Sequence, residues 1–480
     1  MFRGKNKKKL KIKIVICVVV IFFSYINNVL ACTEFYNISN TENAGSEDEQ
    51  VKNNLIEYMD ALHKYKNFHG SVLVKKSGKT LLDCSYGMSD YENEVSNKQE
   101  TKIPIASITK QFTAVAIMKL YEDGLICLDD KISKYIPDFN RGKDISIHNL
   151  LTHTSGIARN YVLTSNKIFS STYEAIYSFK DMKLEFEPGE KFKYSNLGYV
   201  VLGYIIEKVS GVPYEEYVRK NIFEPLNMND TGKCFREDKP YFDSKGYAGF
   251  LELLPMDIEC EKITSNYLAA CDFYSTIEDM DKWESALFSG KILNLHALNI
   301  IFEPHIDISS RIGAYGYGWF VKNSPYGKEV FHDGGSLGHT SIISKYIDKS
   351  VTIIVLTNHA FFKVLDLKNN LAAIIFGDKY ELPKELKELK VELKVYDNIV
   401  GTYKTLENIM LKIVRRDEVL YIVINEVQEI RIFAESEDCF FSKIRDAKFI
   451  FMKDELGNVG NMLIKQYVQE DLIAKKQKDM

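Results

Sequence analysis

Strand-like segments lie at the two ends of a long, mostly helical stretch of this chain. Residues 70–74 and 80–82 are rich in apolar side chains, and Gly78 between them favours a hairpin turn. Comparable runs return only at 340–346 and 351–357. Strands from both flanks of a helical region predict an antiparallel sheet flanked by helices, with a helical subdomain inserted between its strands. The predicted fold class is therefore α/β, of the α+β kind.

The 480 residues are too many for one ordinary domain, and the composition changes after Gly377. A charged, Pro-containing segment within 378–395 is typical of a linker. From residue 396 onward short strand-like runs alternate with turns, which predicts a small β-barrel-like domain over 396–480. These runs lie at 410–414, 419–423, 430–433, 449–452 and 461–464. The main domain is expected at 53–377.

Residues 1–31 have the pattern of an export signal, because seven Lys or Arg residues precede an apolar run that begins at Ile14. Val29-Leu30-Ala31-Cys32 resembles a bacterial lipobox, whose Cys is acylated after cleavage. A lipid anchor, an uncleaved membrane-spanning helix and plain secretion therefore remain open. Each of them predicts an exported protein, either on the outer face of the cell membrane or secreted, with the polar segment 32–52 as a tether.

Charge and cysteine content narrow the function further. Loss of the seven basic residues of 1–31 changes the formal net charge from −4 to −11, which leaves no basic surface to attract nucleic acid. Six Cys residues lie beyond Cys32, at positions 84, 127, 234, 260, 271 and 439, without metal-ligand spacing. They are compatible with disulfides or with small core residues. Nothing in the sequence calls for a metal or an organic cofactor, and the oligomeric state stays open.

Ser107 and Lys110 form the first candidate catalytic element. They open an amphipathic helical segment after Pro104, and residues three apart on a helix share a face, so the Lys110 amine can reach the Ser107 hydroxyl. A serine hydroxyl needs a base to become a nucleophile, and a lysine can act as that base when burial lowers its pKa. The alternative is an ordinary surface Ser and Lys on a helix. Ser107 is, however, the only Ser of the chain with Lys three residues later.

Tyr194-Ser195-Asn196 is the second element. It precedes a long apolar helix, where Tyr194 could relay protons and Asn196 could orient Lys110 or a substrate amide. The pattern is weak by itself, because four other tyrosines also have Asn two residues later. Its position before a helix of the predicted helical subdomain distinguishes this copy.

The segment His332-Asp333-Gly334-Gly335 is the third element, just ahead of the returning strands. Paired glycines let a backbone approach a ligand closely, so an N–H group here could face the Ser107 N–H across a substrate carbonyl. Taken alone, the segment is more simply interpreted as a Gly-rich hairpin loop with an incidental His.

The three elements, in this order and at long separations, resemble the motifs of the serine β-lactamase and penicillin-binding protein superfamily, and the Tyr-led second motif resembles its class C branch. The resemblance covers residues 53–376 and implies a β-lactamase-like fold and acyl transfer through Ser107. The implied site residues are Ser107, Lys110 and Tyr194 for catalysis, Asn196, His332 and Gly334 for substrate binding and orientation, and the Ser107 and Gly335 N–H groups for the oxyanion hole. His153 and Cys271 are expected to have structural roles, the Cys by packing.

The third motif departs from the Lys-Thr-Gly that many β-lactamases and D-Ala-D-Ala peptidases carry. Lys is a fixed cation for a substrate carboxylate, whereas His332 with an ordinary pKa near ~6.5 is mostly neutral at pH 7. The His-x-Gly form resembles D-aminopeptidases and related esterase-like members, some of which carry a β-barrel similar to the lipocalin-like tail. We therefore expect a serine hydrolase acting on a small amide, peptide or ester. A true β-lactamase or D-Ala-D-Ala carboxypeptidase, and a penicillin-binding sensor without turnover, are the alternatives.

Overall fold

The computed structural model describes most of the chain. It describes residues 44–160, 169, 171–236, 239–249, 251, 253–360, 362–426, 428–444, 446–466 and 471–477. The signal expected at 1–31, and residues 32–43 of the expected tether, lie outside this range. Among the residues described, no helix has both the length and the apolar character needed to cross a membrane.

The last part of the expected tether is helical. Residues 44–52 begin helix α2 (Ala44–Lys66). The helix forms because Leu55, Met59 and Leu62, further along it, recur at helical spacing and are buried against the main domain. The polar residues before them extend the same helix, so the main domain begins before residue 53.

An eight-stranded antiparallel sheet forms the centre of the main domain, in the order β12-β13-β14-β15-β16-β17-β1-β2. β1 pairs with both β2 and β17, with Gly70 opposite Thr357, so the two flanks of the domain meet inside one sheet as predicted. Gly78 has a φ of 80°, the left-handed conformation that the tight β1–β2 turn requires. The strands are β1 (Gly70–Lys76), β2 (Lys79–Tyr86), β12 (Ile306–Ser309), β13 (Gly313–Tyr315), β14 (Phe320–Ser324), β15 (Gly327–Gly335), β16 (Thr340–Tyr346) and β17 (Val351–Thr357).

Strands β12 to β15 are not predicted by the sequence pattern. β12 and β13 are only four and three residues long. β15 carries Glu329 at a buried position and ends in the segment that resembles a Gly-rich loop. Glu329 is tolerated there because it forms a buried ion pair with Lys368 of helix α11 (Val364–Phe376). The third motif therefore lies on a strand of the sheet and not in a loop.

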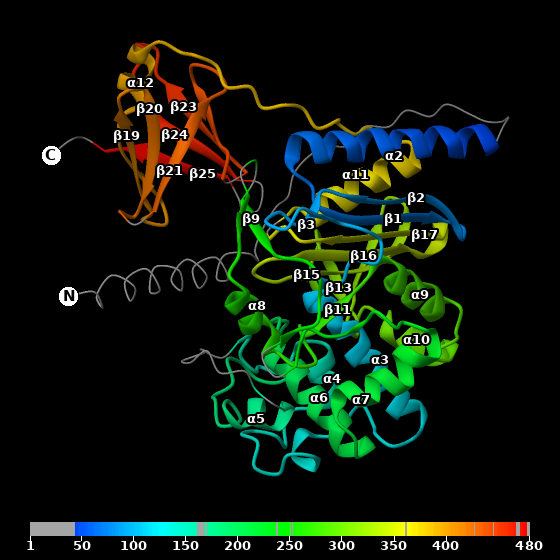
Figure 1. Ribbon diagram of the computed structural model, residues 1–480. Helices are drawn as coiled ribbons and strands as arrows, with labels where there is room; N and C mark the ends of the chain where they lie inside the picture. Colours follow the sequence, from blue (N-terminus) through cyan, green and yellow to red (C-terminus); the bar gives the residue numbers. More distant parts are fainter. Residues whose placement is uncertain are drawn as a thin grey trace.

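Helices cover both faces of the sheet (Figure 1). On one face, α2 packs beside α11 (Val364–Phe376), which buries Val364, Leu367 and Leu371. The inserted helical subdomain lies against the other face, as predicted. The helices of the subdomain, together with α9 and α10 that follow it in the chain, are α3 (Thr109–Glu122), α4 (Ile147–Leu151), α5 (Thr172–Tyr177), α6 (Asn196–Ser210), α7 (Tyr214–Val218), α8 (Ile258–Ser265), α9 (Ile277–Phe288) and α10 (Leu295–Ile301).

Short strand pairs accompany these helices in the main domain. They are β5 (Ile103–Pro104), β6 (Gly232–Lys233) and β11 (Phe273–Ser275) in one small sheet, and β3 (Met88–Asp90) with β4 (Val95–Ser96), β7 (Phe235–Arg236) with β8 (Lys239–Pro240), and β9 (Tyr247–Gly249) with β10 (Leu253–Pro255).

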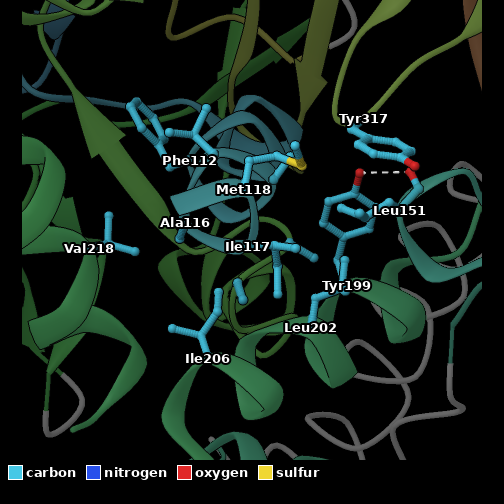
Figure 2. Packing of buried hydrophobic residues seen from close by; sticks show 14 of the residues in the cluster. Phe112, Ala116, Ile117, Met118, Leu151, Tyr199, Leu202, Ile206, Val218 and Tyr317 are labelled. Carbon is cyan, nitrogen blue, oxygen red and sulfur yellow. Dashed lines mark hydrogen bonds between the residues drawn. The ribbon is translucent and has the colours of Figure 1, made fainter. Parts of the chain in front are cut away.

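α3 runs through the middle of the helical subdomain. All of its residues from Thr109 to Met118 are buried, so the helix is enclosed on every side and the expected amphipathic pattern is wrong. Figure 2 shows part of its surroundings, in which Phe112 and Ile117 belong to the same apolar cluster as Leu202 of α6. The enclosure matters for function, because a helix that is packed on all sides holds its first turn in one position.

The C-terminal domain is a closed barrel of eight antiparallel strands, as the tail predicts. β18 pairs with both β19 and β25, which closes the barrel. Apolar side chains fill its interior, among them Tyr403, Phe440 and Met462. Its strands are β18 (Gly401–Thr405), β19 (Met410–Arg416), β20 (Val419–Ile424), β21 (Gln428–Ala434), β22 (Cys439–Ser442), β23 (Ala447–Lys453), β24 (Val459–Gln466) and β25 (Leu472–Lys476), and α12 (Leu393–Ile399) begins inside the expected linker.

The β9–β10 hairpin connects the main domain with the barrel (Figure 1). At its tip the Leu251 N–H donates to the carbonyl oxygen of Lys443 at 2.6 Å, while the side chain of Asn67 donates to the carbonyl oxygen of Leu251 at 2.8 Å. Lys363, just before α11, forms an ion pair with Asp446, which lies between β22 and β23 of the barrel. The hairpin thus contacts both domains.

Candidate active site

Ser107 lies where a strand gives way to a helix. β5 leads into the short 3-10 helix η1 (Ala106–Ile108), and α3 follows without a break. Ala106 has a φ of 46°, a left-handed conformation that is strained for a residue with a Cβ and that clusters at functional sites. The residues on both sides of Ser107 are buried, while Ser107 itself is partly exposed. The turn therefore presents the Ser107 hydroxyl at the N-terminal end of the helix.

Lys110 lies one turn further along and is fully buried. Its Nζ is 2.8 Å from Asn196 Oδ1, 3.0 Å from the carbonyl oxygen of Ala270 and 3.3 Å from Ser107 Oγ. Burial lowers the pKa of Lys110 to about 8. The oxygens of Asn196 and Ala270 can only accept hydrogen bonds, and the neutral amine has two N–H groups to donate to them. The lone pair of the amine is then free to accept the proton of the Ser107 hydroxyl. This geometry suits a general base.

Asn196 fixes one of these contacts. It begins α6, whose N-terminus is capped by Ser195, because the Ser195 hydroxyl oxygen accepts from the Gly198 N–H at 3.0 Å. Asn196 Nδ2 donates to Asn160 Oδ1 at 2.8 Å, which turns Oδ1 of Asn196 towards Lys110. Of the two roles expected for Asn196, the orientation of Lys110 is the one that these contacts support. The sequence does not single out Asn160.

Tyr194 lies beside the Lys110 amine, with Nζ 4.8 Å from the centre of its ring. His153 supports this ring from the helical subdomain. The two ring centres are 4.2 Å apart, and His153 Nδ1 accepts from the Ser195 N–H at 3.1 Å. Burial lowers the pKa of His153 well below its ordinary value, so the imidazole is neutral at pH 7. His153 thus has structural contacts, as expected, and the proton-transfer role of Tyr194 stays a prediction.

His332 is fully buried in the sheet. Its Nδ1 lies 2.6 Å from the carbonyl oxygen of Asp333, and its Nε2 lies 3.1 Å from the hydroxyl of Tyr315. Because a carbonyl oxygen can only accept, Nδ1 carries the proton and Nε2 accepts from Tyr315. Burial, together with the nearby Lys110 charge, lowers the pKa of His332 to about 3. The ring has no exposed surface in this structure and packs 6.1 Å from Tyr194, between ring centres. The part of His332 in substrate binding or orientation stays a prediction.

Gly334 joins the third motif to the nucleophile. Strand β14 pairs with β15 only as far as Phe331. The last residues of β15 therefore extend beyond β14 and lie against η1. A Cβ on Gly334 would lie 2.1 Å from the carbonyl oxygen of Ile105, which shows why no larger residue fits. Ser341 Oγ donates to the same carbonyl at 2.9 Å. Gly334 therefore has a packing role, and substrate binding through it stays a prediction.

Gly335, the next residue, is exposed at the end of β15, and a Cβ there would meet nothing within 4 Å. The close contact of Gly334 with Ile105 keeps this end of the strand beside the turn that carries Ser107. Both N–H groups expected to form the oxyanion hole thus belong to backbone segments in contact with each other. Their joint action on a substrate oxygen stays a prediction.

Cys271 is a site residue that the sequence did not identify. Its Sγ lies 3.4 Å from Ser107 Oγ, although only packing was expected of it. Its neighbours in the site come from distant parts of the sequence, so no local pattern singles it out. The thiols of Cys84, Cys127, Cys271 and Cys439 are free. Within the described range, no group of three or more His, Cys, Asp or Glu side chains could hold a metal ion.

Known proteins match this chain over the main domain alone or over most of its length. The protein-family profile described as Beta-lactamase matches residues 53–375. Penicillin-binding protein 4* of Bacillus subtilis (strain 168) is 28% identical over 444 residues, which is 87% of this chain and 97% of that protein.

Two solved structures also resemble this chain. The octameric penicillin-binding protein homologue from Pyrococcus abyssi has a TM-score of 0.60 and 26% identity, and the match covers 88% of this chain and 99% of that chain. The D-amino acid amidase from Ochrobactrum anthropi SV3 has a TM-score of 0.58 and 26% identity over 68% of this chain and 98% of that one. The chain therefore belongs to the beta-lactamase family, as a serine hydrolase of the penicillin-binding protein superfamily.

Proposed function

We propose that this protein is an exported hydrolase that cleaves a small amide, peptide or ester through an acyl-enzyme on Ser107. The observation that carries the proposal is the environment of Lys110. A buried amine with a pKa lowered to about 8 has two fixed oxygen acceptors and lies 3.3 Å from the candidate nucleophile. A lysine in such an environment is neutral in part of the molecules near pH 7, which is the form that a general base requires.

The reaction that fits this arrangement has two halves. Lys110 takes the proton of the Ser107 hydroxyl while Oγ attacks the substrate carbonyl, and the N–H groups of Ser107 and Gly335 stabilise the negative oxygen that forms. Collapse of this intermediate expels the amine or alcohol, which receives the proton from Lys110 or Tyr194. Water then attacks the ester on Ser107 and gives up a proton to the same pair, which passes it to the departing Ser107 Oγ as the acid is released.

The substrate class follows from the third motif. A neutral, buried His332 offers no fixed cation for a substrate carboxylate, which is the group that a penicillin presents. This favours amides and esters over β-lactams. The similarity to the D-amino acid amidase from Ochrobactrum anthropi SV3 supports an amide of a D-amino acid as the first substrate to try.

A substrate panel tests the proposal. The protein and its Ser107→Ala variant are assayed on D- and L-phenylalanine amide, p-nitrophenyl acetate and nitrocefin. We expect turnover of an amide or the ester above that of nitrocefin, and no turnover by Ser107→Ala. Faster hydrolysis of nitrocefin would instead identify a β-lactamase. Stoichiometric acylation that persists for hours would identify a penicillin-binding sensor.

Export is proposed from the basic and apolar pattern of residues 1–31. Cell fractionation of the full chain and of Cys32→Ala tests it, with Cys17→Ala as the matched control. Loss of membrane association in Cys32→Ala alone supports a lipid anchor. Retention in both variants supports a spanning helix, release of all three proteins into the medium supports secretion, and recovery in the cytoplasm contradicts export.

A further inference from the structure

Three polar atoms of the candidate active site surround the sulfur of Cys271. Besides the 3.4 Å contact with Ser107 Oγ, the Sγ atom lies 3.7 Å from Asn196 Oδ1 and 3.8 Å from Lys110 Nζ. The side chain is 5% exposed and the thiol is free. The residue belongs to the apolar cluster around α3, yet its sulfur lies among the groups that would carry out the reaction.

The backbone holds this sulfur firmly in place. The Cys271 N–H donates to the carbonyl oxygen of Tyr267 at 2.9 Å, and the Ala269 N–H donates to Asp272 Oδ1 at 2.9 Å. Thr113 of α3 donates to the carbonyl oxygen of Ala269 at 2.6 Å. The turn that carries Cys271 is therefore tied to the same enclosed helix that carries Lys110, so the distances between them are set by one rigid unit.

The hydrogen-bonding capacity of each atom limits what the thiol can do. When the Ser107 proton faces the lone pair of neutral Lys110, Oγ keeps its own lone pairs as acceptors. Asn196 Oδ1 is likewise an acceptor, so both oxygens near Sγ suit an S–H donor. A donor on Oγ also favours the negative charge that develops there as the proton leaves.

We propose that Cys271 is a positioning residue for acyl transfer, whose S–H donates to Ser107 Oγ and holds the hydroxyl with its proton towards Lys110. The proposal rests on the function proposed above. It gives the thiol a role that alanine cannot fill and that serine, with its own O–H donor, can fill.

The test compares Cys271→Ala, Cys271→Ser and the matched control Cys84→Ala, which alters a half-buried thiol on β2. Hydrolysis of p-nitrophenyl acetate is measured from pH 6 to 10, with thermal unfolding of each variant. We expect kcat/KM to fall roughly three- to tenfold in Cys271→Ala. Cys271→Ser should keep most of the activity, and Cys84→Ala all of it.

Two results would overturn the role of Cys271. One is a Cys271→Ala enzyme with unchanged kcat/KM. The other is an equal loss in the Ala and Ser variants, which would indicate packing alone. Ser107→Ala is measured alongside: if it retains turnover, the proposed function itself is wrong, whereas an inactive Ser107→Ala beside a normal Cys271→Ala refutes only the role of the thiol.

Discussion

Gly334→Ala should push strand β15 away from the turn that carries Ser107. The added Cβ would lie 2.1 Å from the carbonyl oxygen of Ile105 and 2.4 Å from Ser341 Oγ. Carbon and oxygen atoms that are not bonded need about 3 Å or more, so β15 and η1 must move apart by about 1 Å. Such overpacking costs about 1–3 kcal/mol of stability. A displacement of about 1 Å at reacting groups lowers the rate by about a hundredfold.

The neighbouring glycine provides the control. A Cβ on Gly335 meets nothing within 4 Å, and alanine keeps the N–H group expected in the oxyanion hole. Gly335→Ala should therefore be labelled at the same rate as the parent protein and unfold at the same temperature. The assay is the second-order rate constant for labelling by a fluorophosphonate, together with the melting temperature from circular dichroism.

The comparison has a clear refuting result. If Gly334→Ala is labelled at the parent rate, the contact between β15 and Ile105 does not position Ser107. Equal losses in Gly334→Ala and Gly335→Ala would also contradict the reasoning, because only one of the two added methyl groups meets an obstacle.

Further predictions concern charge. Asn196→Asp places a carboxylate where Oδ1 lies 2.8 Å from Lys110 Nζ, so the pKa of Lys110 should rise and the acidic limb of the kcat/KM profile should move to higher pH. His332 has its pKa lowered to about 3 in the folded protein, so the unfolded state binds more protons between about pH 3 and ~6.5, and stability should fall as pH drops through this window. His332→Gln should make urea unfolding less sensitive to pH between 7 and 5, by up to about 1.4 kcal/mol per pH unit below pH 6. Lys110→Met should reduce the labelling rate by about 10²- to 10⁴-fold while the protein stays folded, because an apolar side chain suits the buried position.

Local patterns were enough to predict the parts of the fold that rest on uninterrupted runs. The apolar runs of β1 and β17 predicted the meeting of the two chain flanks, and the spacing of Ser107 and Lys110 predicted their contact. β15 escaped prediction because its stability comes from tertiary contacts, namely the Glu329–Lys368 ion pair and the packing of Gly334. Cys271 escaped for a similar reason, since its neighbours in space are far from it in the sequence. The start of α2 was missed because its polar first turns depend on apolar residues that come later.

The most direct test of the central claim is the site and pH dependence of covalent labelling. The protein is treated with a fluorophosphonate at pH values from 6 to 10 and the modified residue is identified by tandem mass spectrometry. We predict one adduct, on Ser107, formed at a rate that rises with pH through about 8 as Lys110 loses its proton. An adduct on another residue, or a Ser107 labelling rate that does not change across this range, would contradict the assignment of Ser107 and Lys110 as nucleophile and base.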